Sequence, residues 1–284
     1  MTARFTGRVA LVTGGGSGLG RATALAFARE GATVVVAGRG AAALEQTVKL
    51  IEDEGGRAGA VTADVARSED VARLVETTVE RHGGLHIAFN NAGVLETGPL
   101  ADMDEAAWDR QLAVNLTGVF HCMRHQIAHM RRNGGGVIVN TASNVGAHMR
   151  LPFMGAYAAS KAAVSALTRA AARECAGDGV RVNAISPGPL DTPMSLLPGE
   201  TEDGRAERMA GALPAGRVGT LAEAASAVLW LASPEAAFTV GHDLVVGEDG
   251  RPPRGGAPPA RARGGKGLAP GARAGGRLRF RGGC

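Results

Sequence analysis

Residues 8–20 read Arg8-Val9-Ala10-Leu11-Val12-Thr13-Gly14-Gly15-Gly16-Ser17-Gly18-Leu19-Gly20, and this stretch decides the fold. Its apolar run predicts a buried strand, and helix-forming residues 21–29 follow the last glycine. A strand that enters a helix through a glycine-rich turn is typical of a dinucleotide site, because glycine lets backbone N–H groups approach a pyrophosphate closely. The spacing is Gly-x-x-x-Gly-x-Gly, so the match to the Gly-x-Gly-x-x-Gly fingerprint is incomplete. The plain alternative is a glycine-rich turn that binds no ligand.

Segments with strand and helix patterns alternate outward from this stretch. We expect strands near residues 8–13, 33–37, 58–62, 86–89, 136–141, 180–186 and 243–246. We expect helices near residues 19–30, 41–54, 68–81, 104–131, 154–176 and 222–232. This alternation predicts an α/β, doubly wound (Rossmann) three-layer fold with a mostly parallel sheet of about seven strands. Ligands bind such sheets beyond the carboxyl ends of the strands, where Thr13, Asn90, Ser143 and Pro187 fall.

Tyr157 and Lys161 stand four residues apart in an Ala-rich stretch, so a helix would place both side chains on one face. A lysine ammonium beside a phenol favours the phenolate and should lower the pKa of Tyr157. Ser143 follows an apolar run that would deliver it to the same pocket. The three groups suit carbonyl and alcohol redox chemistry. Taken alone, the pair also fits an amphipathic helix with one core aromatic and one solvated lysine.

Six motifs occur in a fixed order along the chain. They are Thr13-Gly-x-x-x-Gly18-x-Gly20, Asn90-Asn91-Ala92-Gly93, Asn115, Ser143, Tyr157-x-x-x-Lys161 and Pro187-Gly188. In this order and at this spacing the chain resembles the classical short-chain dehydrogenase/reductase family over roughly residues 5–250. The resemblance implies an oxidoreductase that acts on CH–OH groups with NAD(P).

The resemblance assigns catalytic roles to Asn115, Ser143, Tyr157 and Lys161. Tyr157 would exchange a proton with the substrate oxygen, and Ser143 would hydrogen-bond that oxygen. Lys161 would bind the nicotinamide ribose, and Asn115 would hold a water that links Lys161 to solvent. Ser143 lies one residue further from Tyr157 than is commonest in the family, and Asn144 lies at the common distance. The Ser-x-x-Gly run that begins at Ser143 favours the serine.

The resemblance also defines a set of cofactor-binding positions. These are Thr13, Gly14, Gly16, Ser17, Gly18, Leu19, Gly20, Arg39, Asp64, Val65, Asn91, Ala92, Gly93, Tyr157, Lys161, Pro187, Gly188 and Thr192. NAD enzymes carry an acidic residue at the end of the second strand, but here Gly38 stands there and Arg39 follows. A guanidinium suits a 2′-phosphate, so we expect NADP(H), with NAD(H) as the alternative.

Charge divides the chain into two predicted parts, a single catalytic domain over residues 1–250 and a tail over 251–284. The tail holds nine Lys or Arg, no acidic residue, ten Gly and five Pro. The remainder keeps 22 basic against 27 acidic residues, a formal net charge of −5. We expect the tail to be disordered, and it is interpreted as an accidental extension. Nucleic-acid binding could rest only on this tail, which has one aromatic residue.

Targeting and metal signals are absent from the sequence. The N-terminal residues have no apolar core of a signal peptide, and no apolar run is as long as a membrane span. We therefore expect a cytoplasmic protein. Cys122, Cys175 and Cys284 are expected to be reduced thiols. Histidines at 121, 125 and 129 have a spacing that could hold a metal, but we interpret them as one flank of a helix, with no metal.

The substrate is open at this level. The expected pocket wall comprises Val94, Leu95, Glu96, His148, Met149, Met154, Leu190, Met194 and Leu196, with Glu96 as a candidate acceptor for a polyol hydroxyl. Residues 190–215 resemble the mobile substrate loop of the family. The partners expected are a small carbonyl or alcohol substrate and further copies of this chain in a dimer or homotetramer. A catalytically idle NADP-binding scaffold is the other functional class. Such a protein would be expected to lack Ser143, Tyr157 or Lys161, and this sequence has all three.

Overall fold

The computed structural model describes residues 3–197 and 199–247, and the predicted tail over 251–284 lies outside them. Seven strands form one parallel sheet in the order β3-β2-β1-β4-β5-β6-β7. This confirms the doubly wound fold, and every strand pair is parallel. The strands are β1 (Val9–Thr13), β2 (Thr33–Gly38), β3 (Arg57–Thr62), β4 (Ile87–Asn90), β5 (Gly136–Thr141), β6 (Val180–Pro187) and β7 (Asp243–Val246).

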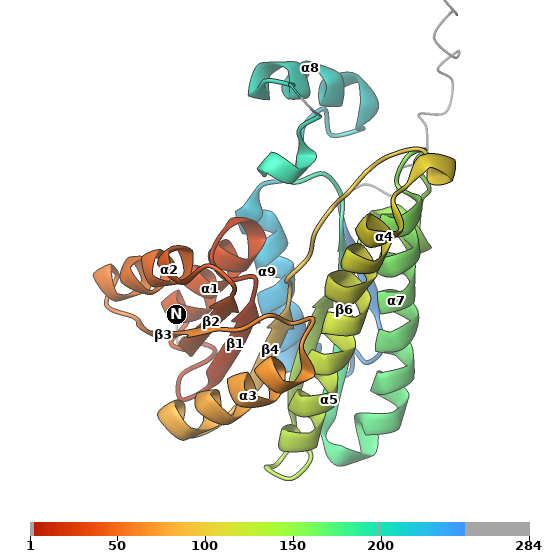
Figure 1. The fold of residues 1–284 in the computed structure, drawn as a ribbon. Coiled ribbons are helices and arrows are strands. Elements are labelled where there is room, and N and C mark those ends of the chain that lie inside the picture. The colour runs from red at the N-terminus through yellow and green to blue at the C-terminus, as the bar shows by residue number, and fades with distance from the viewer. Residues whose placement is uncertain (1–2, 198, 248–284) are drawn as a thin grey trace, which may run out of the picture. The chain divides into compact units, whose positions relative to one another are not determined.

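Helices cover both faces of this sheet (Figure 1). They are α1 (Gly18–Arg29), α2 (Ala41–Asp53), α3 (Ser68–His82), α4 (Glu105–Leu112), α5 (Gly118–Met130), α6 (Asn144–Ala147), α7 (Gly155–Cys175), α8 (Glu202–Ala212) and α9 (Leu221–Ala232). Shorter turns are η1 (Leu100–Asp102), η2 (Ala113–Thr117), η3 (Ala176–Asp178), η4 (Pro193–Ser195) and η5 (Pro234–Ala236).

Strand alternation divides the core into two layers. Ala10 and Val12 of β1 belong to a cluster with apolar residues of α1, α2 and α9. Val9 and Leu11 belong to a second cluster with residues of α3, α5 and α7. Successive side chains of a strand point to opposite faces, so a strand buried on both faces reads as a continuous apolar run. This explains why the sequence pattern located β1.

Two helical regions differ from the sequence expectation. The single helix expected over 104–131 is interrupted by η2, a π-helical turn that contains Asn115. The expected loop over 190–215 contains η4 and the three-turn helix α8, which stands apart from the sheet and its helix layers (Figure 1). Within the described residues, none of the helices has the length and apolar character needed to span a bilayer.

Candidate active site

The glycine-rich turn between β1 and α1 is tightly built. Gly14 and Gly18 have φ angles of +66° and +49°, which disfavour any residue with a side chain. A Cβ on Gly20 would collide with the carbonyl oxygen of Gly14. Ser17, the N-cap of α1, makes no side-chain capping hydrogen bond, so N–H groups of the first turn are left for an anion. The turn therefore fits the pyrophosphate of a dinucleotide.

The end of β4 is hydrogen-bonded to this turn. Asn91 donates from its side chain to the Thr13 carbonyl at 3.2 Å. The backbone N–H groups of Asn91 and Ala92 both donate to the Thr13 hydroxyl, at 3.0 and 3.2 Å. These contacts bring two predicted cofactor segments from β1 and β4 to the same edge of the sheet. The strand order reverses between β1 and β4, which is where a doubly wound sheet binds its ligand.

Arg21 supports the glycine-rich turn, and the sequence did not predict this role. Its guanidinium donates to the Gly16 carbonyl, to the Thr47 hydroxyl at 3.0 Å and to the Gln46 side chain at 2.9 Å. It thereby joins the glycine turn to α2. In the sequence it stood out only as a large residue directly after Gly20. Its partners on α2, Gln46 and Thr47, lie 25 and 26 residues further along the chain. The local sequence around Arg21 therefore could not predict these hydrogen bonds.

Lys161 is buried, with 3% of its surface exposed, and its ammonium donates to the Thr141 carbonyl at 2.7 Å. Burial lowers the pKa of Lys161 to about 8. Its Nζ lies 5.9 Å from the centroid of the Tyr157 ring. The α7 helix therefore presents both groups of the predicted pair to one place, one turn apart.

Burial raises the pKa of Tyr157, and a hydrogen bond with the Ser143 side chain acts in the opposite direction. The pKa of Tyr157 is therefore raised overall, and not lowered as expected, because desolvation of the phenolate is the larger effect. Ser143 also accepts from the Val145 N–H at 3.2 Å as the N-cap of α6. The contact with the phenol supports Ser143 over Asn144 as the predicted partner of Tyr157.

Asn115 is fully buried in the π-helical turn η2. Its side chain accepts from the Val94 N–H at 2.8 Å and donates to the Val94 carbonyl at 2.9 Å. A Cβ placed on Gly93 would lie 3.3 Å from the Asn115 Oδ1 and 3.6 Å from the Lys161 Nζ. Asn115 and Lys161 therefore meet at Gly93. A π-turn widens the helix locally, and such turns are frequent at functional sites.

The turn after β6 is hydrogen-bonded to β7. The Gly188 N–H donates to the Val246 carbonyl at 2.9 Å, which ties Pro187-Gly188 to β7. The Thr192 methyl lies 3.7 Å from where a Gly18 Cβ would be, so this loop reaches over the glycine turn. Arg205 of α8, buried by its neighbours, donates to the Thr192 carbonyl at 3.2 Å. Thr192 thus lies beside the glycine turn and is hydrogen-bonded to α8.

The residues at the end of β2 are those from which the sequence predicted the choice of cofactor. Arg39 is exposed and makes no hydrogen bond or ion pair within residues 3–197 and 199–247. A Cβ on Gly38 would meet only the Leu44 side chain, at 3.6 Å. Asp64 accepts from the Ala66 N–H at 3.0 Å, which orders the loop that also holds the buried Val65. Within the part of the chain described, the end of β2 therefore carries an unpaired guanidinium beside a position without a carboxylate.

Two of the expected pocket residues are engaged elsewhere. Glu96 forms a two-pronged ion pair with Arg110, at 2.7 Å for each contact. This pairing leaves little reason to keep Glu96 as an acceptor for a polyol hydroxyl. His148 donates toward Asp243 across 3.0 Å rather than standing free in the pocket. The remaining expected wall residues are mostly apolar.

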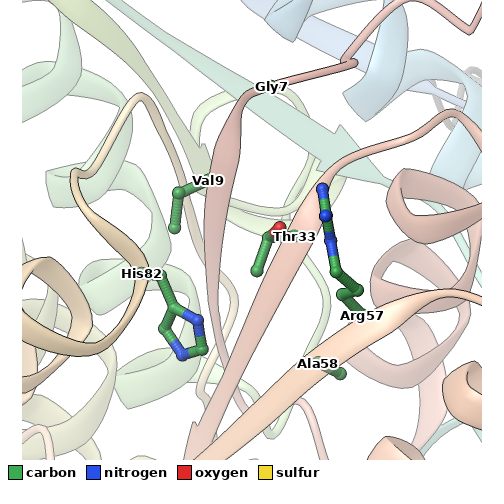
Figure 2. Close-up of a pocket in the computed structure, with 6 residues that line it drawn as sticks. All are labelled: Gly7, Val9, Thr33, Arg57, Ala58 and His82. Atoms are coloured by element: carbon green, nitrogen blue, oxygen red, sulfur yellow. The ribbon is translucent and has the colours of Figure 1, made fainter.

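One hollow of the structure lies away from this site. A hollow of about 450 Å³ lies at the amino ends of β1, β2 and β3, lined by Val9, Thr33, Arg57 and His82 among others (Figure 2). A second hollow, of about 230 Å³, lies beyond the carboxyl ends of β6 and β7 and includes Leu190, Leu213 and Gly219. Only the second adjoins the residues that follow Gly188. The carboxyl edge is where the candidate catalytic groups meet, so the larger hollow is separate from the chemistry.

The fold and this site define an oxidoreductase built around a dinucleotide crevice. A family model described as enoyl-(acyl carrier protein) reductase matches residues 14–248. The chain belongs to the classical short-chain dehydrogenase/reductase family, whose members use NAD or NADP and act on alcohols and ketones.

Individual relatives share most of their length with this chain. It is 39% identical over 247 residues to a cyclohexanol dehydrogenase from Acinetobacter sp. (strain SE19), covering 87% of this chain and 96% of that protein. It is 42% identical over 243 residues to a cis-4-hydroxycyclohexanecarboxylate dehydrogenase from Sinomonas cyclohexanicum, covering 85% and 96%. A crystal structure of levodione reductase superposes with a TM-score of 0.82 at 35% identity, covering 86% of this chain and 97% of that one.

Proposed function

We propose that this chain is an NADP(H)-dependent oxidoreductase that interconverts a ketone or aldehyde and a secondary alcohol, with Tyr157 as the general acid and base. One observation carries the proposal: Ser143, Tyr157 and Lys161 converge from β5 and α7 at the carboxyl edge of the sheet. Asn115 adjoins Lys161 at Gly93. These groups can place a proton donor and an oriented hydroxyl beside one substrate oxygen.

The residues that would hold the cofactor are the glycine turn, Arg39, the 91–93 segment, Lys161 and Thr192. When bound, NADP(H) supplies or accepts the hydride. In reduction, Ser143 hydrogen-bonds the carbonyl oxygen and Tyr157 donates its proton to that oxygen as negative charge develops there. The raised pKa of Tyr157 keeps the phenol protonated near neutral pH, which suits the acid role. In oxidation the same proton returns to Tyr157.

Lys161 and Asn115 support this proton transfer. The Lys161 ammonium, held by the Thr141 carbonyl, stabilises a phenolate formed at Tyr157 after the proton has left. Asn115 fixes the Val94 backbone and places its amide against Gly93, beside Lys161. A water held there would return protons from solvent to Lys161. We therefore infer that Asn115 positions the water through which Lys161 and then Tyr157 are reprotonated.

The NADP(H) preference rests on the end of β2. An acidic residue there would accept from a ribose 2′-hydroxyl and repel a 2′-phosphate, but Gly38 has no side chain. Arg39 is exposed and free of partners within the part of the chain described, so it is available to a phosphate. We infer stronger binding of NADP(H) than of NAD(H).

The substrate is proposed to be a ring ketone or the matching alcohol. Relatives named for cyclohexanol, cis-4-hydroxycyclohexanecarboxylate and levodione motivate this choice. The pairing of Glu96 with Arg110 also argues against a polyol. Turnover of NADPH should be measured with a panel of cyclic ketones, sugars and acyl thioesters. Activity confined to sugars or acyl thioesters would contradict the substrate class.

We also propose a homo-oligomer, with a tetramer as the expected form, in the cytoplasm. Phe238, Trp230 and Val240 are exposed beside α9 and β7, at 104%, 39% and 44% of their surface. The contact expected from the family uses the same two elements. Large exposed apolar side chains close together in the sequence are consistent with a subunit contact there.

A further inference from the structure

Asp243 is a buried carboxylate for which the proposed chemistry has no use. It lies at the start of β7 with 3% of its side chain exposed. No Lys or Arg pairs with it within the described residues, and its side-chain neighbours are two hydroxyls and one imidazole. A buried carboxylate is costly unless its oxygens are hydrogen-bonded, so these three contacts are needed to keep it there.

The three neighbours come from the segments that carry Ser143, the Tyr157-Lys161 pair and the Pro187-Gly188 turn. Ser165 of α7, one turn after Lys161, donates to Asp243 at 2.5 Å. Ser186 of β6, which directly precedes Pro187-Gly188, donates at 2.6 Å. His148, which ends the short turn begun by Ser143, lies at 3.0 Å through its Nε2. One carboxylate thus joins the helix of Tyr157, the Pro187-Gly188 turn and the loop of Ser143.

The His148 contact controls the Ser143 loop because that loop is short and closed on itself. The Gly146 N–H donates to the Met149 carbonyl, and the Met149 N–H donates to the Asn144 carbonyl, both at 2.8 Å. A Cβ on Gly146 would lie 2.9 Å from the Ala158 carbonyl, so one end of the loop rests on α7. The other end is held by His148 on Asp243. Releasing that end would let Ser143 shift relative to Tyr157.

We propose that Asp243 is a positioning residue for catalysis and that His148 is the link through which it fixes Ser143. Asp243 does not touch the reacting atoms. It sets the relative placement of Ser143, the Tyr157 helix and the Pro187-Gly188 turn. Loss of the link should therefore lower kcat, while the glycine turn and Arg39 continue to bind the cofactor. The inference rests on the proposed role of Tyr157.

The test compares substitutions that keep or remove the donor at position 148. His148→Phe and Asp243→Asn should each lower kcat by about tenfold or more, since small misplacements of a reacting group have large effects on rate. His148→Gln, which can still donate, should restore most of the loss. The double variant His148→Phe/Asp243→Asn should lose less activity than the product of the two single losses, because the two residues share one contact. In His148→Phe the dissociation constant of NADPH should stay within about twofold, because the His148 contact does not involve the Pro187-Gly188 turn.

Controls separate positioning from loss of the fold. His242→Phe changes the neighbouring exposed histidine and should leave kcat unchanged. Thermal unfolding of each variant identifies any that fail to fold. If Asp243→Asn does not fold, the comparison of His148→Phe with His148→Gln decides the outcome. Wild-type kcat in His148→Phe, or equal losses in His148→Phe and His148→Gln, would overturn the inference.

Tyr157→Phe is assayed alongside these variants. If it is inactive while His148→Phe and Asp243→Asn turn over normally, the positioning role of Asp243 fails and the proposed function stands. If Tyr157→Phe itself keeps normal turnover, the proposed mechanism fails and takes this inference with it.

Discussion

At the scale of single residues, burial governs the chemistry of the pair on α7. Both Tyr157 and Lys161 are pushed toward their neutral forms, the phenol by a raised pKa and the ammonium by a pKa lowered to about 8. The sequence showed the two residues and their spacing but not how deeply they lie, so it predicted the wrong direction for Tyr157. Tyr157 is therefore a neutral acid, and it lies beside a lysine ammonium that loses its proton more easily than usual.

The lowered pKa of Lys161 should appear in the pH dependence of stability. Between about pH 8 and the usual lysine value of 10.5, the unfolded chain binds a proton that the folded chain has released. Stability therefore rises with pH in that window relative to a Lys161→Met variant, which lacks the group. Urea unfolding of both proteins at about pH 7.5, 9 and 10 measures the difference in stability below and within this window. A difference that is flat or that falls with pH would contradict the buried ammonium.

Cofactor choice is also decided by single residues. Gly38→Asp combined with Arg39→Ala should invert the preference from NADPH to NADH, because attraction to the 2′-phosphate is lost and repulsion is added. The space at Gly38 admits a side chain, since only Leu44 lies within contact distance at 3.6 Å. Calorimetric titration of both cofactors into both proteins measures this. Equal affinity of the unaltered protein for the two cofactors would refute the assignment to Arg39.

At the scale of elements, the sequence predicted what buried apolar patterns encode. The strands and most helices agree with expectation within one or two residues, because runs such as Val34–Val36 are buried on both faces. The π-helical turn at Asn115 lay inside a continuous helical pattern, so periodicity could not reveal it. The helix α8 was missed because its sequence is polar. It is held by tertiary contacts and a Thr201 cap that accepts from Gly204 at 3.1 Å.

Arg205 makes η4 and α8 one unit. Besides Thr192, it donates to Asp191 at 2.5 Å and to the Ser195 hydroxyl at 2.9 Å. Arg205→Gln should loosen the segment that carries Thr192, so KM for the substrate and the dissociation constant of NADPH should rise together by about tenfold or more.

The control for Arg205 is Arg217→Gln. It removes an exposed ion pair with Glu223, and exposed pairs contribute little. Steady-state kinetics and NADPH titration of both variants provide the comparison. Equal, small effects in the two variants would show that α8 does not depend on its buried arginine.

At the scale of the whole molecule, the described residues include exposed apolar side chains that we propose to contact another subunit. Phe238 is fully exposed and lies between α9 and β7 along the chain. Phe238→Asp should lower the assembly state, because a carboxylate placed in an apolar contact must lose its water. Leu50→Asp, at an exposed position on α2, is the matched control. Light scattering at one concentration and salt should find a smaller mass for Phe238→Asp alone. A monomeric parent protein would defeat the assembly proposal.

The central claim is that Tyr157 transfers the proton at a site shared with Ser143 and Lys161. The most direct measurement is the turnover of Tyr157→Phe with NADPH and a cyclic ketone that the parent enzyme reduces, with NADPH binding measured in parallel. Removing one hydroxyl should lower kcat by about 100-fold or more, while the affinity for NADPH and the unfolding temperature stay close to those of the parent. Turnover of Tyr157→Phe within a few fold of the parent would contradict the account.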